Sequence, residues 1–399
     1  MASGLVMKVK TNDIESIRHI NTIMVLNELR NSDHLLSRPN IADNLGLSKV
    51  TISNIARDLN DQSLTEDAGF GVPDSRGGRK PLLLALDRNT KRVLGARISN
   101  STIEVSLCDI TGRDIRNVIS SPLEQDWLLA TTSMVRDIMV YTNTSRDNII
   151  GMVVLFDDDV EGMDGPDGDE AANKLARQLQ EALGIREVRT SSFTRARAFA
   201  ESWYKTQASK RRTSFFYVDL GMKLDCVAVR KSLLDPLPCE FGACHMTALP
   251  YGENGQCVTV DSLLSGRDLK RKAEKLLNRE VTLEQLRVLA ETGDELVLEL
   301  LREYGYWLGC ALALVVNMAG LRKIILGGPI SSLWTFFELT MWKGIEGHVS
   351  ENLKTAIKVQ VIENRFSSGI IGAVALGLDW WVFRTDLLYD AMPSSIPSE

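Results

Sequence analysis

One short segment of this chain combines glycine with positive charge in a way that could bind phosphate. In DSRGGRKP, residues 74–81, Gly77 and Gly78 lie between Arg76 and the pair Arg79 and Lys80. Glycines lack a Cβ and let a partner approach the backbone closely, and the flanking cations attract anions. The residue types alone allow a nucleotide-phosphate loop, a loop that touches DNA, or an ordinary basic turn.

A second group of residues could bind a metal. Cys239, Cys244, His245 and Cys257 supply four sulfur and nitrogen ligands, the number that tetrahedral zinc requires. However, Cys244 and His245 are adjacent in the chain, and the group contains no Cys-x-x-Cys pair. Because free cysteines are commonly small core residues, we favour loop and core positions for them and expect no zinc or other cofactor.

The composition is that of a soluble globular protein with two or three domains. The chain has 399 residues, 44% of them hydrophobic and 25% charged, and a net charge of −6. Residues 1–92 contain 13 Lys and Arg against 11 Asp and Glu, which leaves 33 against 41 for the remainder. A mildly basic N-terminal part on an acidic body is compatible with localised contact with DNA. Neither a secretion signal nor an apolar run of membrane-spanning length is present, so we expect a cytoplasmic protein with no membrane partner.

The N-terminal residues predict three helices. Apolar residues recur at helical spacing over residues 12–30. Ser37 is placed to cap a short helix with Pro39 in its first turn and Gly46 at its end. Ser48 then caps KVTISNIARDLNDQ, whose expected apolar positions are Val50, Ile52, Ile55 and Leu59. Two short helices joined by a tight turn containing glycine are typical of a helix-turn-helix.

The second helix of such a motif enters the major groove of DNA, so its outward side chains are candidate contacts. Asparagine suits adenine, and arginine suits guanine or a phosphate. Arg38 and Asn40 on the preceding helix are expected to meet the DNA backbone, whereas Arg57 could instead pair with Asp58 or Asp61. The predicted DNA-contacting residues of the two helices are Arg38, Asn40, Ser48, Lys49, Thr51, Ser53, Asn54 and Arg57. The alternative is a helical hairpin used only for protein contact.

The position of DSRGGRKP narrows its interpretation. Residues 63–68 and 82–86 could form two strands with this segment in the loop between them, which predicts a winged helix-turn-helix. A nucleotide loop would instead lie between a strand and a helix. We therefore predict that Gly77 and Gly78 bring the backbone close to DNA. The cations Arg76, Arg79 and Lys80 would then reach phosphates or a narrow minor groove.

Beyond about residue 92 the pattern changes to alternating strands and helices. Residues 92–116 resemble a strand hairpin with a turn at Thr111 and Gly112, and residues 214–234 repeat that character. Each hairpin region is followed by strands and helices. A duplicated α/β architecture is therefore expected rather than one long sheet.

These motifs together resemble the repressor branch of the ROK family, to which N-acetylglucosamine and xylose repressors belong. The segments that carry the resemblance are SRPNIADNLGLSKVTISNIARDL, SRGGRKP, VNMAGLRKIILGGPIS and GIIGAVALG. The resemblance implies a winged helix-turn-helix followed by an actin-like, two-lobed sugar-kinase (RNase H-like) body. On this basis we expect a DNA-binding domain at 1–90, a first lobe at 91–212, a second lobe with a dimerisation surface at 213–385, and a flexible tail at 386–399.

Catalytic members of the family carry motifs that are degenerate in this chain. The first phosphate loop, D-x-G-x-T, is replaced by residues 97–101, RISNS, and the general-base aspartate aligns with Phe193, which cannot accept a proton. Asp219 and Gly221 of the second phosphate loop remain. Of the residues that contact sugar in the family, Glu240 and, two positions late, His245 are the candidates here. The zinc loop keeps Cys257 of three cysteines.

The sequence therefore predicts a transcriptional regulator, in particular a repressor, with no catalytic residues. Its partners would be a double-stranded DNA operator, a second copy of the chain in a homodimer or tetramer, and a sugar-like effector. The alternative is an active ATP-dependent carbohydrate kinase with an N-terminal DNA-binding appendage.

Overall fold

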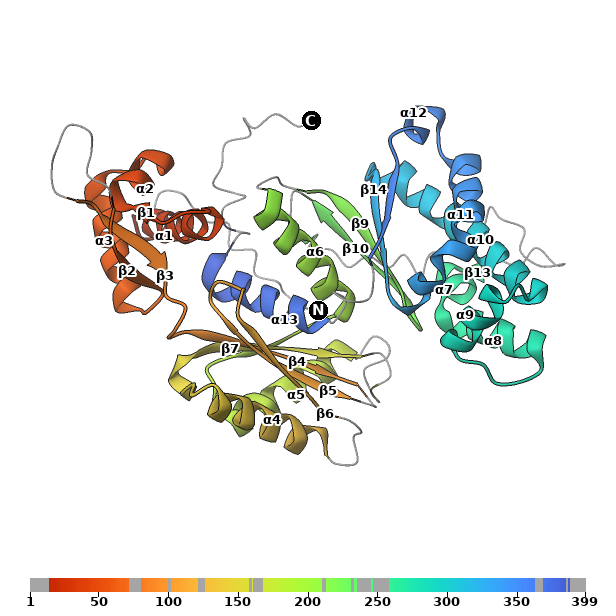
Figure 1. Cartoon of the computed structure of the whole chain (residues 1–399), viewed down its shortest axis with the longest axis horizontal. Helices are drawn as coiled ribbons and strands as arrows, with labels where there is room; N and C mark the ends of the chain where they lie inside the picture. Colours follow the sequence, from red (N-terminus) through yellow and green to blue (C-terminus); the bar gives the residue numbers. More distant parts are fainter. Residues whose placement is uncertain are drawn as a thin grey trace. The chain divides into compact units, whose positions relative to one another are not determined.

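The computed structural model describes residues 14–71, 80–99, 102–120, 126–157, 160, 168–209, 213–230, 233–234, 245–246, 258–362, 369–384 and 387. The chain forms two compact units (Figure 1). The first comprises residues 1–154, 170–190 and 373–399, and the second comprises 155–169 and 191–372. Each unit contains its own five-stranded sheet. The domain boundaries drawn from the sequence at residues 90, 212 and 385 stay predictions.

The N-terminal part of the first unit is a winged helix-turn-helix, as predicted. Its three-stranded antiparallel sheet has the order β1-β3-β2, and Leu36 pairs with Leu84 while Thr65 pairs with Leu86. The fully buried side chains of Ile41, Ile52 and Leu59 fill its core. The elements are α1 (Ile14–Asn31), β1 (Leu36–Ser37), α2 (Arg38–Leu45), α3 (Lys49–Asp61), β2 (Thr65–Phe70) and β3 (Leu82–Leu86).

The first five-stranded sheet has the order β6-β5-β4-β7-β8, and β4–β5 and β5–β6 are antiparallel hairpins. The second hairpin turns at Thr111 and Gly112, where the sequence placed a turn; Gly112 has a φ of 74°. Helices α4 and α5 lie together along this sheet (Figure 1). The elements are β4 (Arg92–Ile98), β5 (Ile103–Asp109), β6 (Ile115–Ser120), α4 (Trp127–Tyr141), β7 (Ile149–Phe156), α5 (Gly168–Leu183) and β8 (Val188–Ser191).

The second five-stranded sheet has the order β11-β10-β9-β14-β15. Strands β9 and β10 form an antiparallel hairpin, whereas β14 runs parallel to both β9 and β15. Numbered along the chain, both five-stranded sheets have the order third, second, first, fourth, fifth, which confirms the predicted duplication. The strands are β9 (Phe215–Leu220), β10 (Leu224–Arg230), β11 (Leu233–Leu234), β14 (Lys323–Gly327) and β15 (Lys358–Val361), and a separate pair is formed by β12 (His245–Met246) and β13 (Val258–Thr259).

Helices of the second unit pack around one large apolar core. Tyr304 of α10 and Phe337 of α11 are both in this core, with ring centroids 5.5 Å apart. Gly305, Gly309 and Gly344 let α10 and α11 approach closely, because a Cβ at any of them would collide with the backbone of the other helix. The helices around this core are α7 (Val260–Leu264), α8 (Gly266–Leu277), α9 (Leu283–Glu291), α10 (Glu295–Ala319), α11 (Trp334–His348) and α12 (Glu351–Lys354). Helix α6 (Phe193–Ser209) belongs to the same unit, and its buried Ala198 lies in a separate apolar cluster. Within the described ranges, no helix is both long and apolar enough to span a membrane.

The C-terminal helix ends in the first unit. Helix α13 (Gly369–Leu378) continues into a π-helical turn, Asp379–Phe383. A Cβ on Gly377 would collide with Val93 and Trp381, so glycine permits a close approach to the first sheet. In the winged helix-turn-helix, Asn27 Nδ2 donates to the Phe383 carbonyl oxygen at 2.7 Å. Helix α1 is therefore tied to the last described turn of the chain, 356 residues away in sequence.

Candidate nucleic-acid interface

The turn between α2 and α3 is fixed by caps on both helices. Ser37 begins α2 in a capping box with Asn40, in which each side chain accepts the other residue's backbone N–H at 3.3 Å. Gly46 ends α2 with a φ of 65°, a left-handed conformation that glycine adopts without a steric penalty. Ser48 begins α3, and its Oγ accepts the backbone N–H of Thr51 at 3.0 Å. These local contacts set the start and direction of the second helix.

One face of α3 packs into the core and the other is exposed. Ile52, Ile55, Ala56 and Leu59 are buried. Thr51 is partly buried, and its Oγ1 lies 2.8 Å from Ser48 Oγ. The predicted contact residues that are exposed on this helix are Lys49, Ser53, Asn54 and Arg57. The outward face therefore carries two cations together with an amide and a hydroxyl.

Val50 departs from the expected pattern. The sequence pattern predicted that it lies among the inward apolar positions of α3, but its side chain is 70% exposed. At 100° per residue, Val50 lies roughly 180° around the helix from Leu59 and on the face opposite the core. An exposed apolar side chain in the first turn of such a helix suits the methyl group of thymine. The helical period alone could have separated Val50 from the other apolar residues.

Arg57 presents its charge on the exposed face. Its Nη2 lies 3.5 Å from Asn54 Oδ1, within the same face. Among the described residues Arg57 forms no ion pair with Asp58 or Asp61, the alternative that the sequence left open. Asp58 instead pairs with Arg18 of α1. The Arg57 guanidinium is therefore not neutralised by a carboxylate of the described chain.

Three other candidates have intramolecular partners. Ser53 Oγ donates to the Lys49 carbonyl oxygen at 2.8 Å. Arg38 Nη2 lies 3.1 Å from Asp67 Oδ1 of β2, so Arg38 joins α2 to the wing. Asn40 remains exposed, although its side chain completes the cap of α2. Bonds of this kind hold the side chains in place, and they also compete with any bond to DNA.

The base of the wing is closed by a backbone hydrogen bond, in which the Gly71 N–H donates to the Pro81 carbonyl oxygen at 2.8 Å. Lys80 is described and exposed. The remaining wing candidates, Arg76, Gly77, Gly78 and Arg79, lie outside the described residues. Phe70, at the end of β2, is 64% exposed.

In the second unit, the position expected for a catalytic base is occupied by an aromatic–cation stack. The guanidinium carbon of Arg197 lies 4.0 Å from the centroid of the Phe193 ring. Arg197 Nη1 also lies 2.7 Å from Asp219 Oδ2, and the two side chains are 10% and 7% exposed. A Cβ on Gly369 would collide with the Phe193 ring, so the ring is confined from that side too. Asp219, the retained carboxylate of the second phosphate loop, is thus engaged in a buried ion pair.

The backbone around Asp219 is also packed closely against protein groups. Gly328 has a φ of 87°, and a Cβ there would collide with Asp219 Oδ1. The Gly221 carbonyl oxygen accepts the backbone N–H of Gly266 at 2.8 Å, so the start of α8 bonds to protein. Burial raises the pKa of the Tyr217 phenol and of the Asp225 carboxyl on the same hairpin. A Cβ on Gly327 would collide with the Tyr217 hydroxyl, so packing requires glycine both at the end of β14 and at Gly328, which follows it.

The remaining candidates for ligand and metal lie largely outside the described chain. Glu240, Cys239, Cys244 and Cys257 are among the undescribed residues. His245 lies in β12 opposite Thr259. Cys108, Cys226 and Cys310 are buried free cysteines. Within the described ranges, no group of three His, Cys, Asp or Glu residues is arranged to hold a metal.

Comparison with known sequences gives a consistent set of relatives. Residues 163–379 match the sequence model described as "ROK family". The chain is 34% identical over 85 residues to a xylose repressor of Staphylococcus xylosus, a match that covers 21% of this chain and 22% of the relative. It is 23% identical over 331 residues to the xylose repressor of Bacillus subtilis strain 168, covering 79% of this chain and 83% of that protein.

Solved structures share the fold. A ROK family transcriptional regulator described as a homologue of the E. coli MLC protein superposes with a TM-score of 0.72 at 16% identity, covering 94% of this chain and 99% of that one. A ROK hexokinase from Thermus thermophilus superposes with a TM-score of 0.56 at 18% identity and covers 72% of this chain and 97% of its own.

Proposed function

The chain belongs to the ROK family, and on that premise we propose that it is a sequence-specific DNA-binding transcriptional regulator that acts as a repressor. Two relatives carry the name xylose repressor, and one of them aligns over most of this chain. The observation that carries the proposal is the exposed face of α3, a helix that Ser48 caps and that presents Lys49, Asn54 and Arg57 away from the core.

The side chains on the exposed face of α3 would make different contacts with DNA. Helix α3 lies in the major groove, where Asn54 reads adenine and Val50 contacts a thymine methyl group. Arg57 reads guanine or binds a phosphate, and Lys49 binds phosphate at the start of the helix. The wing, with Lys80 at its base, follows the adjacent backbone. A homodimer would present two such helices to a two-fold symmetric operator.

We further propose that the body does not phosphorylate sugars. A kinase of this kind needs a carboxylate to accept the proton of the sugar hydroxyl, and Phe193 at the aligned position has no such group. Asp219 is bonded to Arg197 instead of facing a metal–nucleotide. The body would instead hold the dimer together and receive a sugar-like effector. Because of the names of the two relatives, D-xylose is the first effector to test.

The proposal is tested by footprinting the full chain on the DNA upstream of its own gene, with and without D-xylose and other sugars. We expect a protected site with two-fold symmetry, lost in the double variant Lys49→Ala/Arg57→Ala. A double variant that removes the same charge from the second unit, Arg302→Ala on α10 with Lys323→Ala at the start of β14, should protect the same site. Equal protection by all three proteins, or protection by none, would contradict base readout by α3. Sugar-dependent ATP turnover by the wild-type chain would contradict the non-catalytic body.

A further inference from the structure

A cavity of about 320 Å³ lies where the winged helix-turn-helix meets the first sheet. Its walls are the end of α1 with the following loop, strand β3, and the turn between β5 and β6. All of these elements belong to the first unit. The cavity is therefore formed jointly by the DNA-binding part of the chain and the body to which it is joined.

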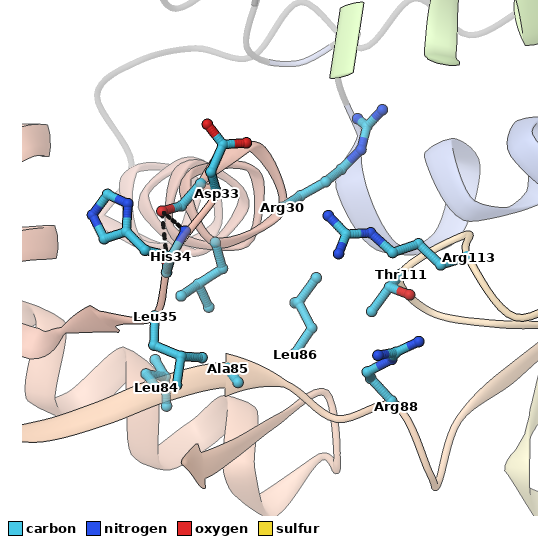
Figure 2. A pocket seen from close by; sticks show the side chains of 12 residues that line it. Arg30, Asp33, His34, Leu35, Leu84, Ala85, Leu86, Arg88, Thr111 and Arg113 are labelled. Atoms are coloured by element: carbon cyan, nitrogen blue, oxygen red, sulfur yellow. Dashed lines mark hydrogen bonds between the residues drawn. The ribbon is translucent and has the colours of Figure 1, made fainter. Parts of the chain in front are cut away.

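Three arginines from three separate segments line this cavity (Figure 2). Arg30 comes from the last turn of α1, Arg88 follows β3, and Arg113 follows the turn at Thr111. In Figure 2 their guanidinium groups lie on the same side of the cavity. Asp33 is the acidic residue of the lining, so cations outnumber carboxylates.

The arginines are held in different ways. Arg30 is 9% exposed, and its guanidinium carbon lies 5.1 Å from the centroid of the Phe383 ring. Arg88 Nε donates to Asp109 Oδ2 at 3.3 Å. In the described part of the chain, the Arg113 guanidinium has no hydrogen-bond or ion-pair partner. One arginine is thus fixed by packing, one is fixed by an ion pair, and one is available to a ligand.

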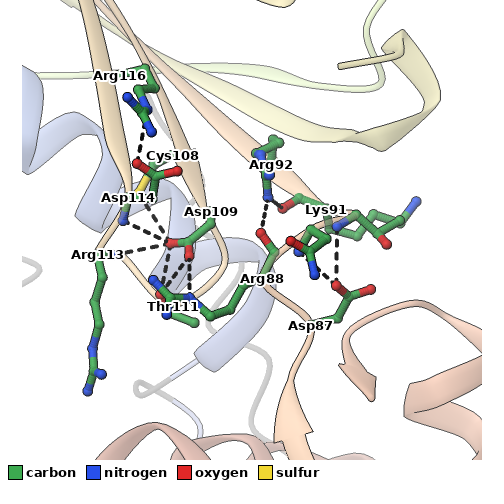
Figure 3. A network of polar contacts seen from close by, with 12 residues as sticks. Asp87, Arg88, Lys91, Arg92, Cys108, Asp109, Thr111, Arg113, Asp114 and Arg116 are labelled. Carbon is green, nitrogen blue, oxygen red and sulfur yellow. Dashed lines mark hydrogen bonds and ion pairs between the residues drawn. The ribbon is translucent and has the colours of Figure 1, made fainter. Parts of the chain in front are cut away.

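Asp109 organises the turn that carries Arg113 (Figure 3). It is 1% exposed, and its Oδ1 accepts the backbone N–H groups of Arg113 at 3.2 Å and Asp114 at 3.4 Å. The Thr111 hydroxyl bonds the same carboxylate at 2.8 Å. The Asp109 carboxylate accepts hydrogen bonds from its own turn and from Arg88. These bonds fix the backbone position from which Arg113 projects.

The opposite side of the cavity is apolar. Leu84 and Leu86 of β3 are buried, and Leu35 is 49% exposed beside them. Figure 2 shows these leucines across the cavity from Arg88 and Arg113. A ligand that fits both sides has a charged end for the guanidinium groups and a carbon skeleton for the leucines.

We propose that this cavity binds a small organic phosphate ester, with its phosphate on Arg88 and Arg113 near Arg30 and its carbon skeleton against Leu35, Leu84 and Leu86. A phosphate monoester carries about 1.5 to 2 negative charges at neutral pH, and planar guanidinium forks match its oxygens. Because the lining comes from both the winged helix-turn-helix and the body, the occupant joins the two. A DNA duplex cannot enter a cavity of this volume.

The test measures binding to the full chain without DNA, so that it is independent of the repressor proposal. Glycerol 3-phosphate and inorganic phosphate are titrated at low ionic strength by calorimetry into the wild type, Arg113→Gln and Arg116→Gln. Arg116 is a matched control because it is exposed on β6, pairs with Asp114 and does not line the cavity. Thermal unfolding of each variant establishes that it is folded.

We expect saturable binding of glycerol 3-phosphate by the wild type and Arg116→Gln, and binding weaker by at least about tenfold in Arg113→Gln, because a charge-assisted contact is lost. Inorganic phosphate should bind more weakly than the ester; equal affinity would overturn the assignment to an ester. Absence of saturable binding, or equal loss in both variants, would overturn the site itself. Unchanged ester binding with weakened operator binding in Arg113→Gln would assign the arginine to DNA and refute the proposal.

Discussion

Arg197 Nη1 lies 2.7 Å from Asp219 Oδ2, and both side chains are almost completely buried. The Phe193 ring covers the guanidinium, so the pair is closed off where a nucleotide-binding carboxylate would need to be open. Arg197 follows Phe193 by four residues on α6, and such residues lie on one helix face. The degenerate catalytic position and the retained aspartate are thereby joined in one packed structure.

Removal of one partner of this ion pair should destabilise the protein. We expect Arg197→Ala to lower the free energy of unfolding by about 3–5 kcal/mol at neutral pH, because Asp219 is left charged and buried. The measurement is chemical denaturation. Lys270→Ala, which breaks a surface pair with Glu274, is the control and should change stability by about 1 kcal/mol or less. Equal effects of the two substitutions would show that the buried pair contributes no more to the free energy of unfolding than the surface pair does.

Gly46 should not tolerate a side chain even though space is free around it. Its φ is 65°, and no atom lies within 4 Å of an added Cβ, so the expected cost is conformational alone. We predict that Gly46→Ala lowers the unfolding free energy by about 1–2 kcal/mol. Gly347→Ala is the matched control, because it also meets no atom within 4 Å but lies inside helix α11. The control should leave stability unchanged or increase it by up to about 1 kcal/mol.

Asn54 should contribute to base recognition. We expect Asn54→Ala to weaken operator binding by about 1–3 kcal/mol and to relax the preference for adenine at one position in each half-site. Fluorescence anisotropy with matched and substituted operators measures both effects. Asn44→Ala is the control, since Asn44 is exposed on α2 and bonds Glu28. A uniform loss across all sequences would instead assign Asn54 to the DNA backbone.

The wing prediction concerns Arg79, which lies outside the described residues. Arg79→Ala should weaken binding about equally for specific and non-specific DNA and reduce the slope of log affinity against log salt by about one. Salt titrations of operator binding provide the measurement. Arg302→Ala removes the same charge from α10 and should leave the slope unchanged. An unaltered slope in Arg79→Ala would show that DSRGGRKP is an ordinary basic turn.

Asp225 should make stability depend on pH. Burial raises the pKa of its carboxyl above the ordinary 3.8, so the folded state binds the proton more tightly than the unfolded state does. Stability is then lost as the pH rises from the ordinary value through the raised one. Asparagine at this position is uncharged over the whole pH range, so it does not lose stability in this way. We therefore expect Asp225→Asn to gain stability relative to wild type as the pH rises above the ordinary value of 3.8. A stability difference that does not change with pH would contradict the raised pKa.

The helix-turn-helix was predictable because its signals are local. Ser37, Gly46 and Ser48 each act on backbone groups within a few residues, and the structure places all three as caps. The strand hairpins were predictable for the same reason. Val50 was misplaced because its hydrophobicity was weighed without its angle around the helix. The domain boundaries and the DNA contacts themselves stay predictions.

Contacts between distant residues could not be predicted from the sequence. Arg18 and Asp58 are 40 residues apart, and Asn27 reaches Phe383 across 356. Pairing of this kind depends on which surfaces meet once the helices and strands have formed. The sequence alone offers many charged or polar residues as possible partners for each of these side chains.

By itself, the sequence determined the local structure of this protein, the duplicated order of its strands and the loss of its catalytic motifs, because caps, turns and residue types act over a few positions. Tertiary structure alone decided that Arg197 neutralises Asp219, that the C-terminal turn holds α1, and that three arginines surround one cavity. These outcomes arise from the packing of distant segments, where burial removes water and makes each choice of partner energetically important.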